Sequence, residues 1–372
     1  MTQLHTVGTV PRMNSIPWIA LVLPMIVASE VQKNVKTNHQ QPIIDAHIQH
    51  TPSSSRSVSM GFLDELFREL TTNPWLQRLL YDVASGEPHR TVFDSIMYRG
   101  MNVRAIIVHG LMGSGTGNAT DQMLIEHFEI LNQMKNPSVL KSYYLLGWDK
   151  SETVKDVSDR VVALRTKGLD VVGMKVHSIA QQISFKSAHI QNAFEIANAT
   201  NLSLLLHTGF GIAENVNGCL NVTYKDPFYL KDLIQQYPEV NVILAHLGKL
   251  WYESAQQLVR DNENVWVDAS AFEWPMNGRE YVCDPEMTLI PGDQRASIMN
   301  DFRHDRIVYG SGGRQSPGHE WRYLKMLNSE MPIATHPKFY YENAREAFQL
   351  DRRTADGLPK RRSRPSRRSA LR

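Results

Sequence analysis

Two histidines in the middle of the chain, His207 and His246, each follow a short apolar run and could carry chemistry. The runs lie in residues 202–209 (LSLLLHTG) and 241–248 (NVILAHLG). Each has four or five apolar residues, too few for a typical helix, and is bounded by turn residues, which is typical of a buried parallel strand. Imidazole transfers protons near neutral pH and binds metal ions, so an edge that gathers several histidines suits either kind of chemistry.

Residues 226–237 connect these two strands and are expected to be helical. Asp226 suits the N-cap position and Pro227 the first helical position, and apolar residues share one face. A strand, helix, strand unit with a right-handed crossover places His207 and His246 side by side at the carboxyl ends of two strands.

The same alternation continues along the chain and predicts an α/β fold, a (β/α)8 TIM barrel. Strands are expected at residues 43–48, 103–110, 140–148, 169–177, 202–209, 241–248, 265–270 and 306–310, and further helices at 121–134, 153–167, 185–200, 320–327 and 337–350. Gly168 is expected to end one helix as its C′ residue. A helical insertion is expected after the first strand at residues 61–84, interrupted at Asn73-Pro74.

The active site of such a barrel lies at the carboxyl ends of its strands. Lys175 and His177 share one face of the fourth strand, because strand side chains repeat every two residues. A single histidine at this edge is most often a hydrogen-bonded core residue, but packing alone does not explain so many. The residues expected there are His47, His109, Lys175, His177, His207, His246 and Asp268.

Length and composition agree with one large domain. With 372 residues and 42% hydrophobic content, the chain can bury a barrel-sized core, expected at residues 42–351 between an N-terminal segment (1–41) and a basic tail (352–372). We expect the tail to be a disordered, solvated segment with no specific nucleic-acid partner, with a nuclear-import signal or an anionic partner as the alternative. Cys219 and Cys283 leave two free thiols and one disulfide equally open.

An apolar stretch near the N-terminus, residues 16–28, bears on location. It is too short to span a bilayer, and it resembles the apolar region of a signal peptide, although only Arg12 supplies positive charge before it. We expect a cytoplasmic protein without a membrane span, with secretion as the alternative. Its expected partners are a small-molecule substrate and further copies of itself in a homo-oligomer.

Taken together, the motifs resemble the amidohydrolase-related family, the amidohydrolase 2 type barrels that include metal-dependent hydrolases, decarboxylases and hydratases acting on small carboxylated compounds. The resemblance covers residues 43–350 and rests on IIDAHIQH in the first strand, GMKVH in the fourth, LLLHTG in the fifth, ILAHLG in the sixth, RIVYGS in the eighth and ENAREAF in the closing helix. Two positions depart from the family's metal motif. Gln49 replaces the second histidine of the first strand, with His50 one place along, and Gly312 replaces the eighth-strand aspartate.

The resemblance implies a divalent metal, with zinc favoured, held by His47, His207 and His246. An all-histidine set is acceptable for zinc. The family's sixth-strand histidine, here His246, also polarises the substrate and the attacking water. The family's eighth-strand aspartate binds metal and takes the proton from water, and Gly312 can do neither.

A substitute base must therefore come from elsewhere. Asp268, Glu273 and His177 are candidates, and His177 is favoured because its ordinary pKa is close to neutral. The alternative for Asp268 is a structural one, as a helix N-cap or a hydrogen-bonding partner of another site residue.

Three further residues are expected to bind substrate: Lys175, Gln49 and His109. Lys175 could clamp a substrate carboxylate, become carbamylated and bridge two metals, or pair with an acid on a neighbouring strand. The clamp is the simpler functional reading, because a bridged pair of metals needs ligands that this sequence lacks.

Hydrolysis of an ester, lactone or amide by a metal-bound water is the favoured function, on a small carboxylated or cyclic substrate. A carbon-carbon lyase of the decarboxylase type is the first alternative. An inert, binding-only barrel is the second, because Gly312 removes a catalytic aspartate and fold does not guarantee function. Turnover without metal would indicate a metal-free lactonase.

Overall fold

A computed structural model of the chain describes residues 39–50, 101–110, 121–125, 127–129, 141–209, 220–270, 292–311 and 335–351. All of them belong to one compact unit. Several expected features lie outside the described residues: the apolar stretch 16–28, the helical insertion 61–84, the helix 320–327, the tail 352–372, and Cys219, Glu273, Cys283 and Gly312. No helix within the described ranges is both long and apolar enough to cross a membrane.

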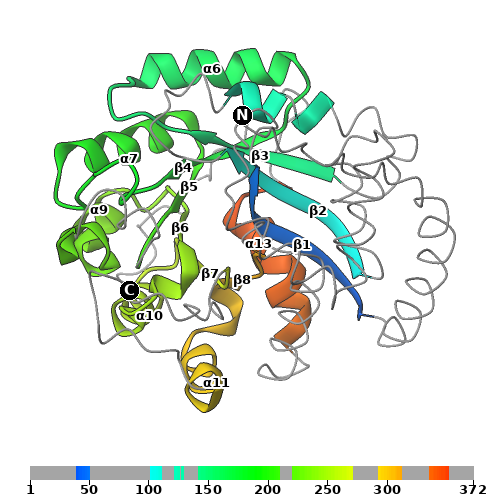
Figure 1. Cartoon of the computed structure of the whole chain (residues 1–372), viewed down its shortest axis with the longest axis vertical. Coiled ribbons are helices and arrows are strands. Elements are labelled where there is room, and N and C mark those ends of the chain that lie inside the picture. Colours follow the sequence, from blue (N-terminus) through cyan, green and yellow to red (C-terminus); the bar gives the residue numbers. More distant parts are fainter. Residues whose placement is uncertain are drawn as a thin grey trace, which may run out of the picture. The chain divides into compact units, whose positions relative to one another are not determined.

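The described residues contain eight strands that pair in sequence order, every pair parallel. The first strand also lies beside the end of the last one, as the hydrogen bond from the Ala46 amide to the Tyr309 carbonyl at 2.9 Å shows. The strands therefore form a nearly closed barrel, which confirms the predicted fold (Figure 1). Their bounds are β1 His39–His50, β2 Met101–Gly110, β3 Lys141–Gly147, β4 Val171–Val176, β5 Ser203–Leu206, β6 Val242–Leu244, β7 Val265–Asp268 and β8 Ile307–Val308.

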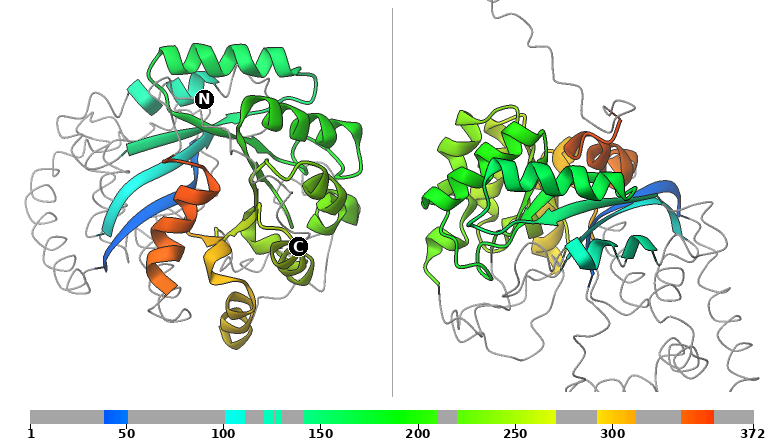
Figure 2. Two further views of the ribbon diagram at one scale, coloured as in Figure 1. Left: turned by 180° about the vertical axis from the view of Figure 1, so that it is seen from behind. Right: turned by 90° about the horizontal axis from the view of Figure 1, so that it is seen from above.

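Helices follow one another around the outer side of the strands (Figures 1 and 2). The expected helix 153–167 is α6, Val154–Thr166, and its first turn is closed by a capping box between Thr153 and Asp156. Gly168 follows its C-cap with φ +95°, a conformation that favours glycine, so the predicted stop is confirmed. The other helices are α7 (Ala188–Thr200), α9 (Lys231–Gln236), α10 (Tyr252–Asp261), α11 (Gly292–Asp301) and α13 (Asn343–Ala347).

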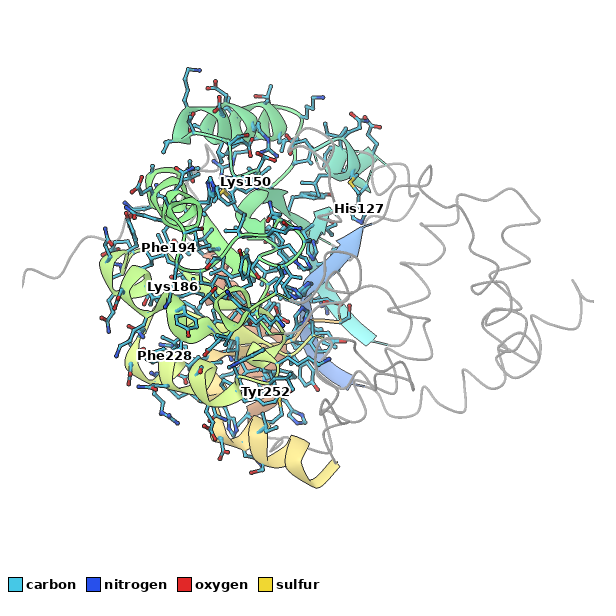
Figure 3. All side chains as sticks on the ribbon, turned by 60° about the vertical axis from the view of Figure 1, so that its left-hand side comes forward. His127, Lys150, Lys186, Phe194, Phe228 and Tyr252 are labelled. Carbon is cyan, nitrogen blue, oxygen red and sulfur yellow. The ribbon has the colours of Figure 1, made fainter. Side chains whose placement is uncertain are left out.

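The connection between β5 and β6 confirms its predicted start. The Asp226 side chain accepts the amide of Phe228, and Pro227 opens a 3₁₀ turn, Pro227–Leu230, that leads into α9. Helices α10 and α11 were not predicted. Phe194 of α7, labelled in Figure 3, is fully buried. Its ring packs against that of Tyr237, with 5.8 Å between centroids.

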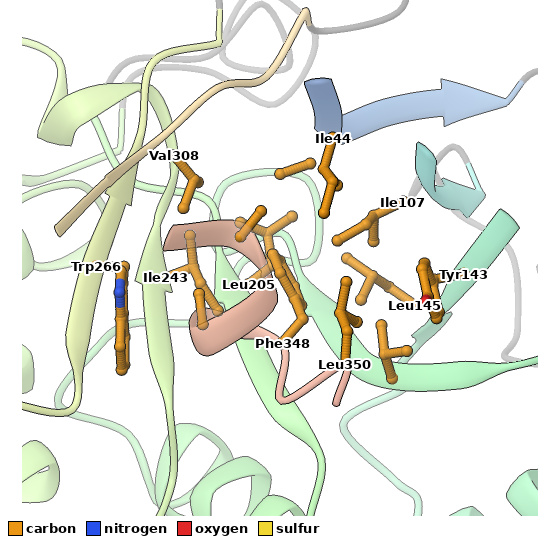
Figure 4. Close-up of a cluster of buried hydrophobic side chains, with 14 of the residues drawn as sticks. Ile44, Ile107, Tyr143, Leu145, Leu205, Ile243, Trp266, Val308, Phe348 and Leu350 are labelled. Atoms are coloured by element: carbon orange, nitrogen blue, oxygen red, sulfur yellow. The ribbon is translucent and has the colours of Figure 1, made fainter. Parts of the chain in front are cut away.

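The last helix closes one end of the barrel. Phe348 and Leu350, just after α13, join a buried apolar cluster with Ile44, Leu205 and Ile243 from the strands (Figure 4). The Ala347 carbonyl accepts bonds from the side chains of Ser203 at 2.8 Å and Asn241 at 3.0 Å, which stand where β5 and β6 begin. The amino ends of the strands are therefore covered, and the carboxyl ends form the other edge.

Candidate active site

The side chains expected to carry chemistry meet at the carboxyl ends of the strands. His47, His109, Lys175, His207 and Asp268 are at least nine-tenths buried, whereas His177 and His246 keep part of their surface exposed. The Gln49 side chain lies outside the described residues. The ring of His109 lies 4.9 Å from that of His47, edge on.

Asp268, at the end of β7, is the centre of this group. Its Oδ2 lies 3.0 Å from His47 Nδ1, and its Oδ1 accepts the Ser270 amide at 2.8 Å and the Ser270 hydroxyl. The His246 amide points at the same Oδ1 from 3.4 Å. The carboxylate is fully buried, so these donors replace the water that it has lost.

His246 is placed by an unusual turn rather than by the strand. The strand β6 ends at Leu244, short of the expected 248, because His246 (φ 61°), Leu247 (φ 55°) and Gly248 (φ 74°) all take left-handed conformations. Such a conformation costs a residue other than glycine roughly 1–3 kcal/mol and tends to occur at functional sites. The turn places His246 Nδ1 at 2.8 Å from the Ser270 carbonyl and Nε2 at 3.2 Å from His207 Nδ1.

His207 lies between two other imidazoles. Its ring stacks on that of His177, with centroids 3.8 Å apart and planes within 13°, and meets that of His246 edge on at 4.9 Å. His207 Nε2 is buried and has no hydrogen-bond partner among the described residues. Burial, together with the neighbouring imidazoles and Lys175, holds the pKa of His207 well below its ordinary value. Burial likewise lowers the pKa of His246 to about 3 although Asp268 opposes the shift, so both rings are neutral at pH 7.

In His177, the base favoured by the sequence, one ring nitrogen faces a backbone donor. Its Nδ1 accepts the Ala180 amide at 3.2 Å. The neutral ring therefore carries its proton on Nε2, which can donate a hydrogen bond but has no lone pair to accept a proton.

Lys175 is a buried cation that makes no hydrogen bond to the part of the chain that the structure describes. The side chain is 1% exposed, and its Nζ has no partner among the described residues. Burial lowers the pKa of Lys175 to about 8, and attraction to Asp268 only partly opposes that effect. A buried ammonium group that lacks a partner is energetically unfavourable. A bound ligand that supplied the partner would remove this cost, so such a group is expected where a ligand binds.

Three residues could hold a metal ion. His47, His246 and Asp268 each offer a ligand atom, and these atoms lie within 4.8 Å of one another. Two imidazoles and one carboxylate match the donor set of many catalytic zinc sites. Of the histidines predicted as ligands, His47 and His246 belong to this group, and His207 lies against His246. The structure therefore adds Asp268 to the predicted histidines as a candidate ligand.

Ser270 and Gly310 were missed by the sequence analysis. Ser270 is fully buried, and its hydroxyl oxygen lies 2.9 Å from Nδ1 of both His47 and His246. Ser270 could have been found from its spacing, because side chains two residues apart share one face of a strand, and Ser270 follows Asp268 as His177 follows Lys175. A Cβ at Gly310 would lie 2.9 Å from His47 Cβ and 3.2 Å from Ser270 Cβ, so β8 approaches these side chains because the residue is glycine.

Comparisons with known proteins give a family and a fold. The sequence model of a family described as Amidohydrolase (Amidohydro_2) matches residues 152–350. A search of curated proteins finds no match. An uncharacterized TIM-barrel protein from Bordetella bronchiseptica superposes with a TM-score of 0.52 at 12% identity, over 83% of this chain and 98% of that one.

Two other solved structures are similar. For 2,6-dihydroxybenzoate decarboxylase from Rhizobium the TM-score is 0.51 at 14% identity, over 84% of this chain and 99% of that one. For a probable 2-pyrone-4,6-dicarboxylic acid hydrolase from Acinetobacter baumannii, with citric acid bound, it is 0.48 at 13% identity, over 82% and 99%. At these identities the likeness to the solved structures concerns the fold.

Proposed function

The chain belongs to the amidohydrolase family, and we propose that it is a metal-dependent hydrolase acting on a small carboxylated or cyclic substrate, a lactone or an amide. The observation that carries the proposal is the buried carboxylate of Asp268, 3.0 Å from His47 Nδ1 and in reach of the same ion as His47 and His246. Asp268 stands on the seventh strand, and in this proposal it takes the role that the resemblance assigns to the eighth-strand aspartate.

The residues that would hold the ion are His47, His246 and Asp268. A divalent ion bound there would polarise the carbonyl of the substrate and lower the pKa of a water molecule. The chain's own contribution is to orient the reactants and to move the proton. A carboxylate has about four lone-pair positions, and among the described residues Asp268 Oδ2 faces the donor His47 Nδ1, so this oxygen can accept the proton of the attacking water and return it to the leaving group.

Lys175 is the proposed binding group for a substrate carboxylate. Its ammonium group is buried and lacks a hydrogen bond within the described residues, so a carboxylate would remove an unfavourable state as well as add an attraction. His109 would contact the substrate beside His47, and Gln49 is proposed to do the same. His177 would form a wall of the pocket, stacked on His207.

Decarboxylation is a second candidate, and one observation favours it. Three donors already point at Asp268 Oδ1: the Ser270 amide, the Ser270 hydroxyl and the His246 amide. Much of the carboxylate is therefore engaged within the protein. Cleavage of a carbon-carbon bond needs no base to activate water, so this reaction would tolerate an Asp268 that only orients its neighbours.

The test combines metal analysis with two assays. Purified protein is analysed for zinc and manganese, and then supplied with small lactones and amides, followed by acid release, and with aromatic carboxylates, followed by CO2 release. Under the hydrolase proposal, lactone or amide turnover falls about 10²- to 10⁴-fold in Asp268→Asn. Exposed Asp261 supplies the matched control, and Asp261→Asn should keep wild-type turnover.

Three outcomes would contradict the proposal of a metal-dependent hydrolase. Release of CO2 that survives in Asp268→Asn would favour the decarboxylase, and turnover in protein freed of metal would favour a metal-free lactonase. Bound metal with no turnover of any substrate would favour a binding protein. His304 provides a further control, because it precedes β8 at the other end of the barrel, and His304→Gln should match wild type where His246→Gln loses metal.

A further inference from the structure

Ser270 connects three of the residues that the proposed function uses. It stands two residues after Asp268, at the end of β7, and is fully buried. Its hydroxyl donates to Asp268 Oδ1 and lies 2.9 Å from both His47 Nδ1 and His246 Nδ1. One hydroxyl is therefore shared by two imidazoles and one carboxylate.

The number of protons in this group decides which atoms donate. A hydroxyl has one proton, and the carboxylate of Asp268, which only accepts, is its nearest partner. The hydroxyl oxygen is then left with lone pairs, and both imidazole Nδ1 atoms must donate to it. The second neighbours agree, because His246 Nδ1 also faces the Ser270 carbonyl at 2.8 Å and His47 Nδ1 faces Asp268 Oδ2 at 3.0 Å.

A neutral imidazole carries one proton, so a proton on Nδ1 leaves a lone pair on Nε2. His246 Nε2 lies 3.2 Å from His207 Nδ1 and therefore accepts the proton of that atom. The same count then gives His207 a lone pair on Nε2, the buried atom that has no partner among the described residues. The three rings thus share one tautomer, with protons on Nδ1 and lone pairs on Nε2.

We propose that Ser270 is a positioning residue, whose hydroxyl holds His47 and His246 in the Nδ1–H tautomer and leaves Nε2 as the ligand atom of each ring. At His246 a bound ion would replace the His207 Nδ1–H that this lone pair accepts in the metal-free protein. Metal-binding histidines usually donate their other ring N–H to a fixed acceptor, and loss of that acceptor typically weakens metal binding 10- to 100-fold. The consequence for metal binding rests on the proposed function. The tautomer assignment concerns the metal-free protein and does not.

The first measurement is the ¹⁵N chemical shift of the ring nitrogens in metal-free protein, with each ring assigned from His47→Gln, His207→Gln and His246→Gln variants. We expect protonated Nδ1 and unprotonated Nε2 for His47, His207 and His246. A proton on Nε2 of His47 or His246 in the wild type would overturn the proposal. In Ser270→Ala we expect the shifts of His47 and His246 to move toward a mixture of tautomers.

The second measurement is zinc affinity by calorimetry. Ser270→Ala should bind zinc 10- to 100-fold more weakly, and Ser270→Thr, which keeps a hydroxyl, should recover part of the loss. Ser203 supplies the matched control, because it is also buried but donates only to the Ala347 carbonyl. Ser203→Ala should keep wild-type shifts and affinity, even if it loses stability.

The two measurements separate the proposal from the function on which it partly rests. If the wild type shows the expected shifts and binds no zinc, the proposed function fails and the tautomer assignment stands. If zinc binds and Ser270→Ala changes neither shifts nor affinity, Ser270 is not a positioning residue, whatever reaction the protein catalyses.

Discussion

Two largely buried cations, Arg160 and Lys175, have very different surroundings in the same fold. Arg160 of α6 bonds to Asp121 at 2.6 and 2.8 Å, to Glu152 at 2.5 Å and to the Gly147 carbonyl at 3.0 Å. Burial works to lower the pKa of Arg160, but the bonds and charges of Asp121 and Glu152 outweigh it and raise that pKa. Lys175 has no hydrogen bond among the described residues, and its pKa falls to about 8.

This difference in hydrogen bonding distinguishes a charged side chain with a structural role from one that is placed to bind a ligand. At least four of the five N–H donors of Arg160 are engaged by Asp121, Glu152 and the Gly147 carbonyl, so this residue connects α6 to the end of β3. Lys175 stands at the end of β4, beside Asp268 and two neutral imidazoles, and no described residue accepts a hydrogen bond from its ammonium group. Burial is common to both, and the partners decide the role.

The largest expected effect on stability comes from Arg160. Arg160→Met leaves Asp121 and Glu152 as partly buried carboxylates without their partner, and breaking a buried pair in this way typically costs about 3–5 kcal/mol. We expect the free energy of unfolding, from urea titration at pH 7, to fall by that amount. Zinc affinity should not change. A loss below about 1 kcal/mol would show that the network is not structural.

Lys175 should respond in the opposite sense. Lys175→Met replaces an unpaired charge by an apolar chain of similar length, so the free energy of unfolding should stay the same or rise. The kcat/KM for a carboxylated substrate should fall about 10²- to 10³-fold, through loss of a buried charge pair worth about 2–5 kcal/mol. The kcat/KM for the methyl ester of the same substrate should change little. An equal loss for acid and ester would contradict the carboxylate clamp.

The pH dependence of stability tests the same lysine without any substrate. Between pH 8 and 10.5 the unfolded chain keeps the Lys175 proton and the folded chain has lost it, so stability rises with pH in this window. The rise attributable to Lys175 is about 3 kcal/mol, from a pKa difference of about 2.5 units. It is measured as the difference between wild type and Lys175→Met in urea titrations from pH 7 to 11. A difference that stays flat would mean that Lys175 keeps its ordinary pKa.

Lys249 is a useful internal control for that experiment. Burial lowers the pKa of Lys249 to about 8 as well, so both proteins share its contribution, which cancels in the difference. The Arg160→Met variant, compared with wild type in the same way, should show no slope between pH 8 and 10.5, because arginine stays charged throughout.

Much of the barrel could be predicted from sequence because its signals are local. Each buried parallel strand is an apolar run between turn residues, and Thr153, Gly168 and Asp226 mark helix ends by their own hydrogen bonds or conformation. The missed helix α10 had a signal too, since Ala255, Leu258 and Val259 recur at helical spacing and are buried.

The site was predicted less completely because its details depend on distant contacts. The position of His246 depends on left-handed conformations at His246 and Leu247, which sequence does not favour and the surrounding packing imposes. That no described residue bonds to Lys175 could not be predicted from sequence either, because it depends on which side chains the neighbouring strands place beside it. The role of Asp268 follows from the approach of β7 to β1, 221 residues away along the chain.

The smallest effect is expected at Arg303, which has partners like Arg160 but little burial. Arg303 bonds to Glu263 at 2.8 Å and to Asp305 at 3.1 Å, with exposed fractions of 31% for its own side chain, 71% for Glu263 and 37% for Asp305. Solvent and salt screen such a pair, so Arg303→Met should cost less than about 1 kcal/mol in free energy of unfolding, and less again in 1 M salt. If the cost equalled that of Arg160→Met, the number of partners rather than burial would control how much an ion pair stabilises this protein. The contrast between Arg160 and Lys175 would then follow from their partners alone and not from the low polarity of their surroundings.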